Sequence, residues 1–390
     1  MALPFYYNWR NLRRRRLSVA MTFLLVGVVV FVLSALLSFA AGIRESLAAT
    51  GSSRNVIVLK PGSTAESTSI LLPAEAARIV QAPNIARGST GQLLISPELC
   101  VQTNIPRRGP VGTPASVAIR GVDDIAYELH SEVKIIEGRI PRQGTMEIIV
   151  GKAARDRYRN LDVGGQLEMG RLANRVFSVV GVFESGGGAL ESEIWAPRTM
   201  LEDAFNRRFL SSVVVRLEDP RRAQETIDYL TGPAVELDAE LETKYYNELS
   251  TKTREIVFLT TVLISIMAIG AIFAVANTMY AAVDGRKREI AMLRTIGFAR
   301  GSIMLSFVIE SLLITTSACA AGLAASLFLN GSRKDFLSDT TWTVLAYELR
   351  ITPTILLTAF GLATLVGVGG ALAPALKASR LRVIEALRKA

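Results

Sequence analysis

The stretch GRKREIAMLRTIGFARGSI, residues 285–303, lies between two long apolar runs and guides the interpretation of the whole chain. Five basic residues and one acid surround Ile290, Leu293 and Ile296. In a helix these three apolar residues share one side. Glu289 falls on the same side, which suits a protein pocket better than a lipid surface. We therefore predict a short helix that docks onto another protein; a helix that rests on the membrane surface is the alternative.

Four apolar segments indicate a membrane protein. Residues 17–43, 256–283 and 351–376 contain no charged residue, and residues 301–332 contain Glu310 alone. Each segment exceeds the roughly 20 apolar residues that a helix needs to cross a bilayer. We therefore predict an α-helical membrane protein with four transmembrane helices.

The positive charge of the chain is concentrated in three short regions. Residues 1–16 hold five basic residues and no acid, residues 284–300 hold five and two, and residues 377–390 hold five and one. Basic residues beside membrane spans mark the cytoplasmic side. We expect a membrane protein with both termini in the cytoplasm and residues 44–255 outside. This distribution argues against nucleic-acid binding, which the net charge of +9 alone would allow.

Residues 51–235 predict an extracytoplasmic α+β domain between the first and second transmembrane helices. Its strands are expected at residues 55–59, 116–120, 147–150, 175–183 and 212–217, where valine and isoleucine are frequent. Its helices are expected at residues 73–80, 152–159, 198–205 and 221–230. Loops are expected at residues 61–69 and 104–113.

The flanks of this domain predict a stalk. Residues 236–256 contain no glycine or proline, so we expect the second transmembrane helix to continue outward, over residues 236–283. The first transmembrane helix is likewise expected to continue out of the membrane, over residues 17–50. The other divisions are an amphipathic N-terminal helix at 1–16, the docking loop at 284–300, the third helix at 301–332, an external loop at 333–350, the fourth helix at 351–376 and the tail at 377–390.

No group of residues predicts catalysis or a cofactor. His130 is the only histidine, and we expect it at the surface, without a metal. Cys100 and Cys319 lie in different parts of the chain and are not expected to pair. The glycine and lysine at 151–152 lack the remaining pattern of a phosphate-binding loop, and the glycines at 186–188 suit a flexible loop. We therefore expect a non-catalytic subunit that holds no cofactor.

Glu310 is a charged residue inside an apolar span. Such a residue costs roughly 2–3 kcal/mol on insertion scales and is therefore rarely incidental. We predict that it pairs with a nearby arginine or faces a partner helix. A role in proton or substrate coupling is the alternative.

Several motifs resemble those of the MacB/FtsX-type (type VII) ABC transporter permeases. The stretch RKREIAMLRTIGFARGSIMLSFVIESLL is similar to the family's cytoplasmic loop and the span that follows. The matching residues are Arg286, Glu289, Ile290, Leu293, Arg294, Ile296, Gly297 and Glu310. The tail matches the family's ending at Pro374, Ala378, Glu385, Ala386, Leu387 and Arg388, and departs from it at Val383, where proline is usual. VAIRGVDD, IIEGRIP and EIIVGKAA resemble parts of the MacB-like periplasmic core domain.

The resemblance implies a permease subunit of the bacterial inner membrane, whose movement is driven by ATP hydrolysis in a separate protein. It implies a homodimer, or a pair of related chains, bound to two copies of a cytoplasmic ABC ATPase that holds ATP and magnesium. The matching residues of the loop, together with Arg288, would form a coupling helix that contacts this ATPase. ATP hydrolysis would then move the stalk and the extracytoplasmic domain, which is called mechanotransmission.

The same resemblance leaves three roles open. Export or efflux across the envelope, with a periplasmic adaptor and an outer-membrane channel as further partners, fits the long insert and the short N-terminus. An FtsX-like transmitter would instead control cell-wall hydrolases. A Lol-like permease would extract lipoproteins from the membrane.

Overall fold

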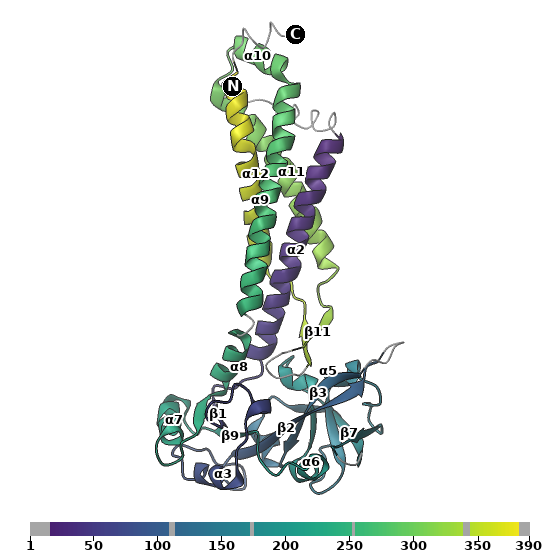
Figure 1. Ribbon diagram of the computed structural model, residues 1–390, viewed down its shortest axis with the longest axis vertical. Helices are drawn as coiled ribbons and strands as arrows, with labels where there is room; N and C mark the ends of the chain where they lie inside the picture. Colours follow the sequence, from purple (N-terminus) through teal and green to yellow (C-terminus); the bar gives the residue numbers. More distant parts are fainter. Residues whose placement is uncertain (1–15, 109–113, 172–174, 252–253, 338–343, 382–390) are drawn as a thin grey trace. The chain divides into compact units, whose positions relative to one another are not determined.

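The structure, a computed structural model, describes residues 16–108, 114–171, 175–251, 254–337 and 344–381. It divides into two compact units (Figure 1). The helical unit comprises Met1–Ala41, Arg254–Ser332 and Leu349–Ala390. The sheet unit comprises Gly42–Thr253 and Arg333–Glu348.

Four long helices make up most of the helical unit. They are α2 (Arg16–Ala48), α9 (Arg254–Gly285), α11 (Arg300–Leu327) and α12 (Pro353–Ser379), and the short α10 (Lys287–Thr295) lies between α9 and α11 in the chain. Each long helix has the length and hydropathy needed to cross a membrane. All four contribute to one buried core, for example through Val29, Val275, Cys319 and Ala363.

Small residues bring these helices close together. A Cβ atom on Gly322 would lie 2.5 Å from the carbonyl oxygen of Gly27, so α11 and α2 touch through their backbones. Ser311 Oγ donates a hydrogen bond of 2.7 Å to the carbonyl oxygen of Gly367, which joins α11 to α12. Small residues therefore let the helices pack closely within one chain.

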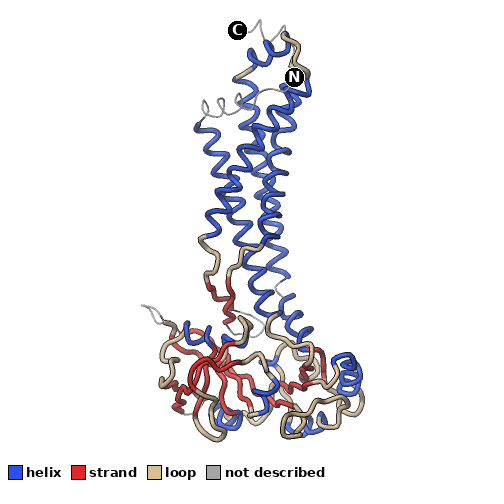
Figure 2. The backbone as a smooth tube through the Cα atoms, turned by 180° about the vertical axis from the view of Figure 1, so that it is seen from behind, coloured by secondary structure: helices blue, strands red, loops and turns tan. Residues whose placement is uncertain are grey.

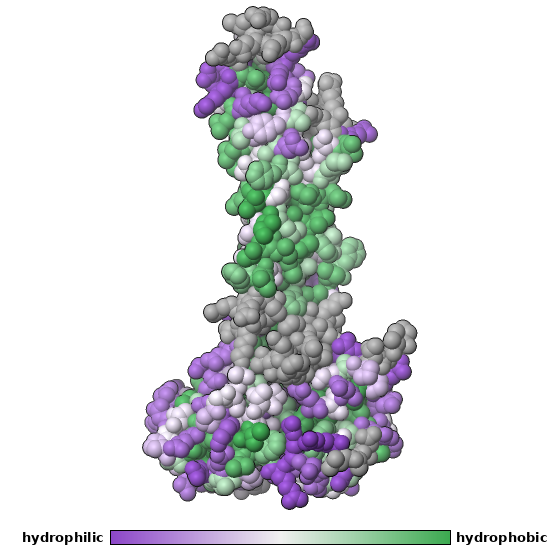
Figure 3. Space-filling view, viewed as in Figure 1, coloured by the Kyte–Doolittle hydropathy of each residue, from purple (hydrophilic) through white to green (hydrophobic). Residues whose placement is uncertain are grey.

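The surface of the helical unit suits a lipid environment. Figure 3 shows a broad hydrophobic band over its helices. Phe258, Leu263 and Phe273 of α9 and Leu357 of α12 are exposed apolar residues on this unit. Since every backbone group of a long helix is hydrogen-bonded internally, such a bundle can lie in hydrocarbon.

A mixed sheet forms the centre of the sheet unit (Figure 2). Its strands are β1 (Asn55–Leu59), β2 (Ile95–Pro106), β3 (Pro114–Val122), β4 (Lys134–Gly138), β5 (Glu147–Gly151), β6 (Gln166–Met169), β7 (Arg175–Glu184), β8 (Ile194–Pro197), β9 (Ser212–Arg216) and β10 (Asp238–Leu241). Their order is β10-β1-β9-β2-β3-β8-β5-β7-β4, and β6 pairs with β7. The pairs β3–β8 and β5–β7 are parallel, and the other pairs are antiparallel.

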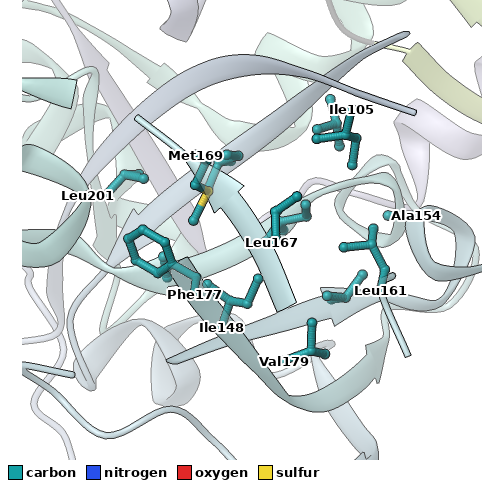
Figure 4. Close-up of a cluster of buried hydrophobic side chains, with 14 of the residues drawn as sticks. Ile105, Ile148, Ala154, Leu161, Leu167, Met169, Phe177, Val179 and Leu201 are labelled. Atoms are coloured by element: carbon teal, nitrogen blue, oxygen red, sulfur yellow. The ribbon is translucent and has the colours of Figure 1, made fainter. Parts of the chain in front are cut away.

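Strand β2 joins the two halves of this sheet, one that contains β10, β1 and β9 and one that contains β3, β8, β5, β7 and β4. In β2, Ile95 to Glu98 pair with β9, whereas the residues from Leu99 onward pair with β3. Each half has its own apolar core. The core beside β3, β5 and β7 includes Phe177 and Leu201 (Figure 4), and the core beside β1 and β9 includes Val215.

Short helices cover the sheet. They are α3 (Pro73–Ile79), α4 (Ile125–Leu129), α5 (Lys152–Arg157), α6 (Arg198–Phe205), α7 (Ala223–Thr231) and α8 (Glu242–Thr251), with 3-10 turns η1 (Glu66–Thr68), η2 (Ala189–Ser192) and η3 (Pro220–Arg222). The five expected strands and four expected helices are all present, with ends that differ by at most a few residues. Strands β2, β4, β6, β8 and β10 were not anticipated, because they are short or carry polar residues that break the alternation.

Four expectations about loops and the stalk were wrong in part. Residues 104–106 belong to β2 and not to a loop, and residues 66–68 form η1. The stalk segment is not helical from its start, because residues 238–241 form β10, which pairs with β1. The external loop contains a hairpin of β11 (Arg333–Leu337) and β12 (Val344–Glu348). Tertiary strand pairing overrides the helical propensity of the stalk segment.

Candidate coupling site

The short helix predicted in the stretch 285–303 is present as α10. Its end is formed by Gly297, whose φ of 103° is a left-handed conformation that glycine adopts without strain. The amide of Phe298 donates to the carbonyl of Leu293, and the amide of Gly297 donates to that of Arg294. This pair of bonds is a Schellman motif, which ends a helix sharply.

A buried ion pair fixes the start of α10. Arg286 Nη1 and Nη2 donate hydrogen bonds of 2.9 and 2.8 Å to the two carboxylate oxygens of Glu310. The side chains are 9% and 3% exposed. The guanidinium group also lies 5.8 Å from the ring centre of Phe307. Because a bidentate pair defines both distance and orientation, the residue before α10 is held firmly against α11.

The other end of α10 is tied to α12. Arg294 Nη1 donates a hydrogen bond of 2.8 Å to the carbonyl oxygen of Ser379, near the C-terminus of α12. Ile290 is 3% exposed and packs with Phe307 and Ala375, among others. Helix α10 is therefore braced between α11 and α12 within the helical unit.

The residues expected to contact a partner differ in their exposure, because α10 packs against α11 and α12. Ile290 and Arg286 are buried within the chain, where Ile290 packs with Phe307 and Arg286 pairs with Glu310. Leu293, Arg294 and Glu289 are partly buried. The side chains that remain exposed on α10 and its end include Arg288, Met292 and Ile296, together with Gly297. The sequence could have indicated this exposed face, because Arg288, Met292 and Ile296 are spaced four residues apart. Met292 was not among the predicted contact residues.

The C-terminal motif is described only in part. Pro374 lies inside α12, where it and Ala378 are buried. Glu385, Ala386, Leu387 and Arg388 lie outside the described residues.

The sheet unit contains a buried ion network, made up of Glu66, Glu98, Arg120, His130 and Glu193. Arg120 lies 2.7 Å from Glu66, 2.6 Å from Glu98 and 2.8 Å from Glu193. His130 Nε2 lies 3.0 Å from Glu98. The network joins η1, β3, the residue before β8 and the point where β2 changes partner, so it holds the two halves of the sheet in register.

The prediction that His130 lies at the surface was wrong. Its side chain is 2% exposed and lies between Glu98 and Glu132. Burial disfavours its charged form, but the Glu98 charge and hydrogen bonds to Glu132 and Glu98 raise the pKa of His130 to about 10. Burial likewise disfavours the Glu98 carboxylate, but the charges of His130 and Arg120 lower its pKa to about 2. Both groups are therefore charged at neutral pH.

The described residues hold no group of histidine, cysteine and acidic side chains arranged for a metal ion. Cys100 is buried, and burial raises the pKa of its thiol. Cys319 is buried in the helical core. Neither thiol is placed as a reactive group.

Two family models match the chain. The model of the FtsX-like permease C-terminal matches residues 261–383, which include α10, Arg286 and Glu310. The model of the MacB-like periplasmic core domain matches residues 19–232, which include most of α2 and the sheet strands through β9. The chain belongs to the MacB/FtsX-type family of ABC transporter permeases.

Several known proteins are similar to parts of this chain. The chain is 25% identical to the macrolide export ATP-binding/permease protein MacB of Burkholderia orbicola, over 99% of this chain and 58% of that protein. It is 26% identical to MacB 1 of Yersinia pestis bv. Antiqua, over 73% of this chain and 44% of that protein. The chain thus spans about half the length of these curated relatives. The periplasmic region of MacB from Actinobacillus actinomycetemcomitans aligns with 12% identity and a TM-score of 0.36, over 52% of this chain and 94% of that structure.

Proposed function

We propose that this permease couples ATP hydrolysis by a separate cytoplasmic ABC ATPase to movement of its extracytoplasmic sheet unit, for export across the envelope. The observation that carries the proposal is the bracing of α10 at both ends. A docking helix transmits force only if it cannot rotate or slide against the helices that carry it. The Arg286–Glu310 pair and the Arg294–Ser379 bond restrain it in both respects.

The exposed side of α10 is the proposed contact with the ATPase. Met292 and Ile296 are 50% and 76% exposed, with the basic Arg288 on the same side. Two apolar side chains beside a cation suit an apolar groove with an acidic rim. ATP and magnesium would be held by the ATPase, so this chain would be a non-catalytic membrane subunit.

The charge distribution supports the proposed topology. Basic residues cluster in residues 1–16, 284–300 and 377–390, which supports a cytoplasmic location for both termini and α10. The sheet unit would then be periplasmic, between the first and second of four transmembrane helices. A homodimer or a pair of related chains, with two ATPase copies, would complete the complex.

Export is favoured over the two alternatives by the names of relatives. The proteins that match over most of this chain are described as macrolide export proteins. We propose export for this chain without assigning macrolides as its substrate. A periplasmic adaptor and an outer-membrane channel would be further partners. Co-purification of an adaptor would support this role, whereas a cell-wall hydrolase would favour FtsX-like signalling and a lipoprotein would favour Lol-like extraction.

The test is purification of the tagged full-length chain in mild detergent, with the bound proteins identified. We expect an ABC ATPase to co-purify with the wild type. Ile296→Asp should reduce the bound ATPase at least about tenfold, because it places a charge at the centre of an apolar contact. Ile70→Asp is the matched control, since Ile70 is an exposed apolar residue of the sheet unit. Equal ATPase recovery with Ile296→Asp and the wild type would reject α10 as the contact.

A further inference from the structure

The loop from Ser185 to Ser192, here called the glycine loop, connects the buried strand β7 to the central strand β8. The glycines at 186 and 187 have φ values of 58° and 81°, which allow a tight turn. Glu191 Oε1 accepts hydrogen bonds from the amides of Ser185 (2.9 Å) and Gly187 (2.7 Å). The loop is therefore ordered by its own carboxylate and is not the flexible connection that its glycines suggested.

The sheet holds this loop tightly from one side. A Cβ atom on Gly151 would lie 2.2 Å from the carbonyl oxygen of Glu191, so β5 and the loop touch through their backbones. Leu190 is buried in a cluster with Phe183 and Trp195. A displacement of the loop must therefore displace β8 and its neighbours as well.

The end of α2 meets the other side of the glycine loop through Thr50. The buried hydroxyl of Thr50 donates a hydrogen bond of 2.8 Å to the carbonyl oxygen of Ser46, in the last turn of α2. The same oxygen accepts a hydrogen bond of 2.7 Å from the amide of Ala189, at the start of η2. One hydroxyl thus joins the backbone of α2 to the backbone of the glycine loop.

Close packing at Gly188 makes this joint resist compression. A Cβ atom on Gly188 would lie 3.0 Å from Thr50 Oγ1 and 3.4 Å from the carbonyl oxygen of Ala49. The hydrogen bond resists separation, and the backbone contact resists closer approach. Strand β12 also lies against η2, and its hairpin is the direct connection between α11 and α12. Two connections from long helices therefore meet at one loop.

We propose that the glycine loop is the point at which α2 and the β11–β12 hairpin act on the sheet, with Thr50 as the positioning residue that fastens α2 to it. This inference rests on the proposed function, in which helix movements drive the sheet unit. Movement of α2 would shift Ala189 through Thr50 and then β8. The hairpin would add the movement of α11 and α12, the two helices that brace α10.

The experiment measures amide hydrogen exchange of residues 185–192 in the full-length chain, in nanodiscs with its ATPase, with and without ATP and vanadate. Thr50→Val keeps the shape of the side chain and removes both hydrogen bonds. We expect it to raise exchange in the loop about tenfold, as loss of one hydrogen bond predicts, and to abolish the difference that ATP causes. Thr50→Ser retains the hydroxyl and should behave like the wild type.

Thr226→Val is the matched control, because Thr226 is a buried threonine of the same unit whose hydroxyl donates to the carbonyl of Pro83, away from the loop. It should leave the loop's exchange and its response to ATP unchanged. An unchanged response to ATP in Thr50→Val would overturn the inference. If no ATPase binds the wild type, the proposed function fails. The exchange rate of the glycine loop then still tests whether Thr50 fastens α2 to that loop: equal exchange in Thr50→Val and Thr226→Val would reject this connection.

Discussion

At the residue scale, the pairing of Arg286 with Glu310 explains why a charge occurs inside an apolar helix. Each charge alone would be costly in this buried site, and each satisfies the other through two short hydrogen bonds. The sequence motif that contains both residues therefore encodes an intrachain brace. Of the two roles that were open for Glu310, this geometry supports structural pairing.

Breaking the pair should destabilise the chain more than removing it. We expect Arg286→Met or Glu310→Gln to cost about 3–5 kcal/mol, because each leaves a buried group without its partner. The double variant Arg286→Met with Glu310→Met should recover most of this loss. Thermal unfolding in detergent would measure the stability of each variant. Single variants as stable as the wild type would contradict the brace.

The buried ion network should make the stability of the sheet unit depend on pH. The pKa of His130 is raised from 6.5 to about 10 in the folded chain. Its stabilising effect is therefore complete below pH 6.5 and is lost as the pH rises toward 10. The pKa of Glu98 is lowered from 4.5 to about 2, so its effect is lost as the pH falls between these values.

The loss of stability at alkaline pH can be assigned to His130 by substitution. The melting temperature of the wild type should fall between pH 7 and pH 9.5, and His130→Gln should be less stable at pH 7 but show a smaller further fall. This follows because Gln cannot lose a proton over that range. Differential scanning calorimetry of the full chain in one detergent would measure both slopes. Parallel slopes for the two proteins would show that His130 does not carry this dependence.

At the element scale, α10 depends on its sharp end as well as on its braces. Gly297 adopts a φ of 103°, and Gly301 at the start of α11 has open space around it. We expect Gly297→Ala to cost about 1 kcal/mol and to weaken ATPase binding about fivefold, since alanine is strained at this φ. Gly301→Ala should have no such effect. Titration of the purified ATPase against each variant would measure this, and equal weakening by both would reject the argument.

At the scale of the whole molecule, the proposed topology places two exposed sites on opposite sides of the membrane. Gln81 of the sheet unit and Thr295 of α10 are exposed, whereas the native Cys100 and Cys319 are buried. An impermeant maleimide should therefore label Gln81→Cys from the periplasmic side and leave Thr295→Cys unlabelled until the cells are broken. Labelling of Thr295→Cys in intact spheroplasts would reverse or reject the topology.

The sequence alone determined the four apolar helices, the short helix α10 and its glycine end, and five strands of the sheet. These features depend on local periodicity, length and turn chemistry, which neighbouring residues carry. Strand β10 was mistaken for helix because its residues have helical propensity, and only pairing with β1 makes them extended. The positions of Ile290, His130 and Thr50 were decided by the tertiary structure. Each depends on partners that are distant in the chain, so no local pattern could show that Ile290 faces inward, that His130 is buried in an ion network or that Thr50 joins α2 to the glycine loop.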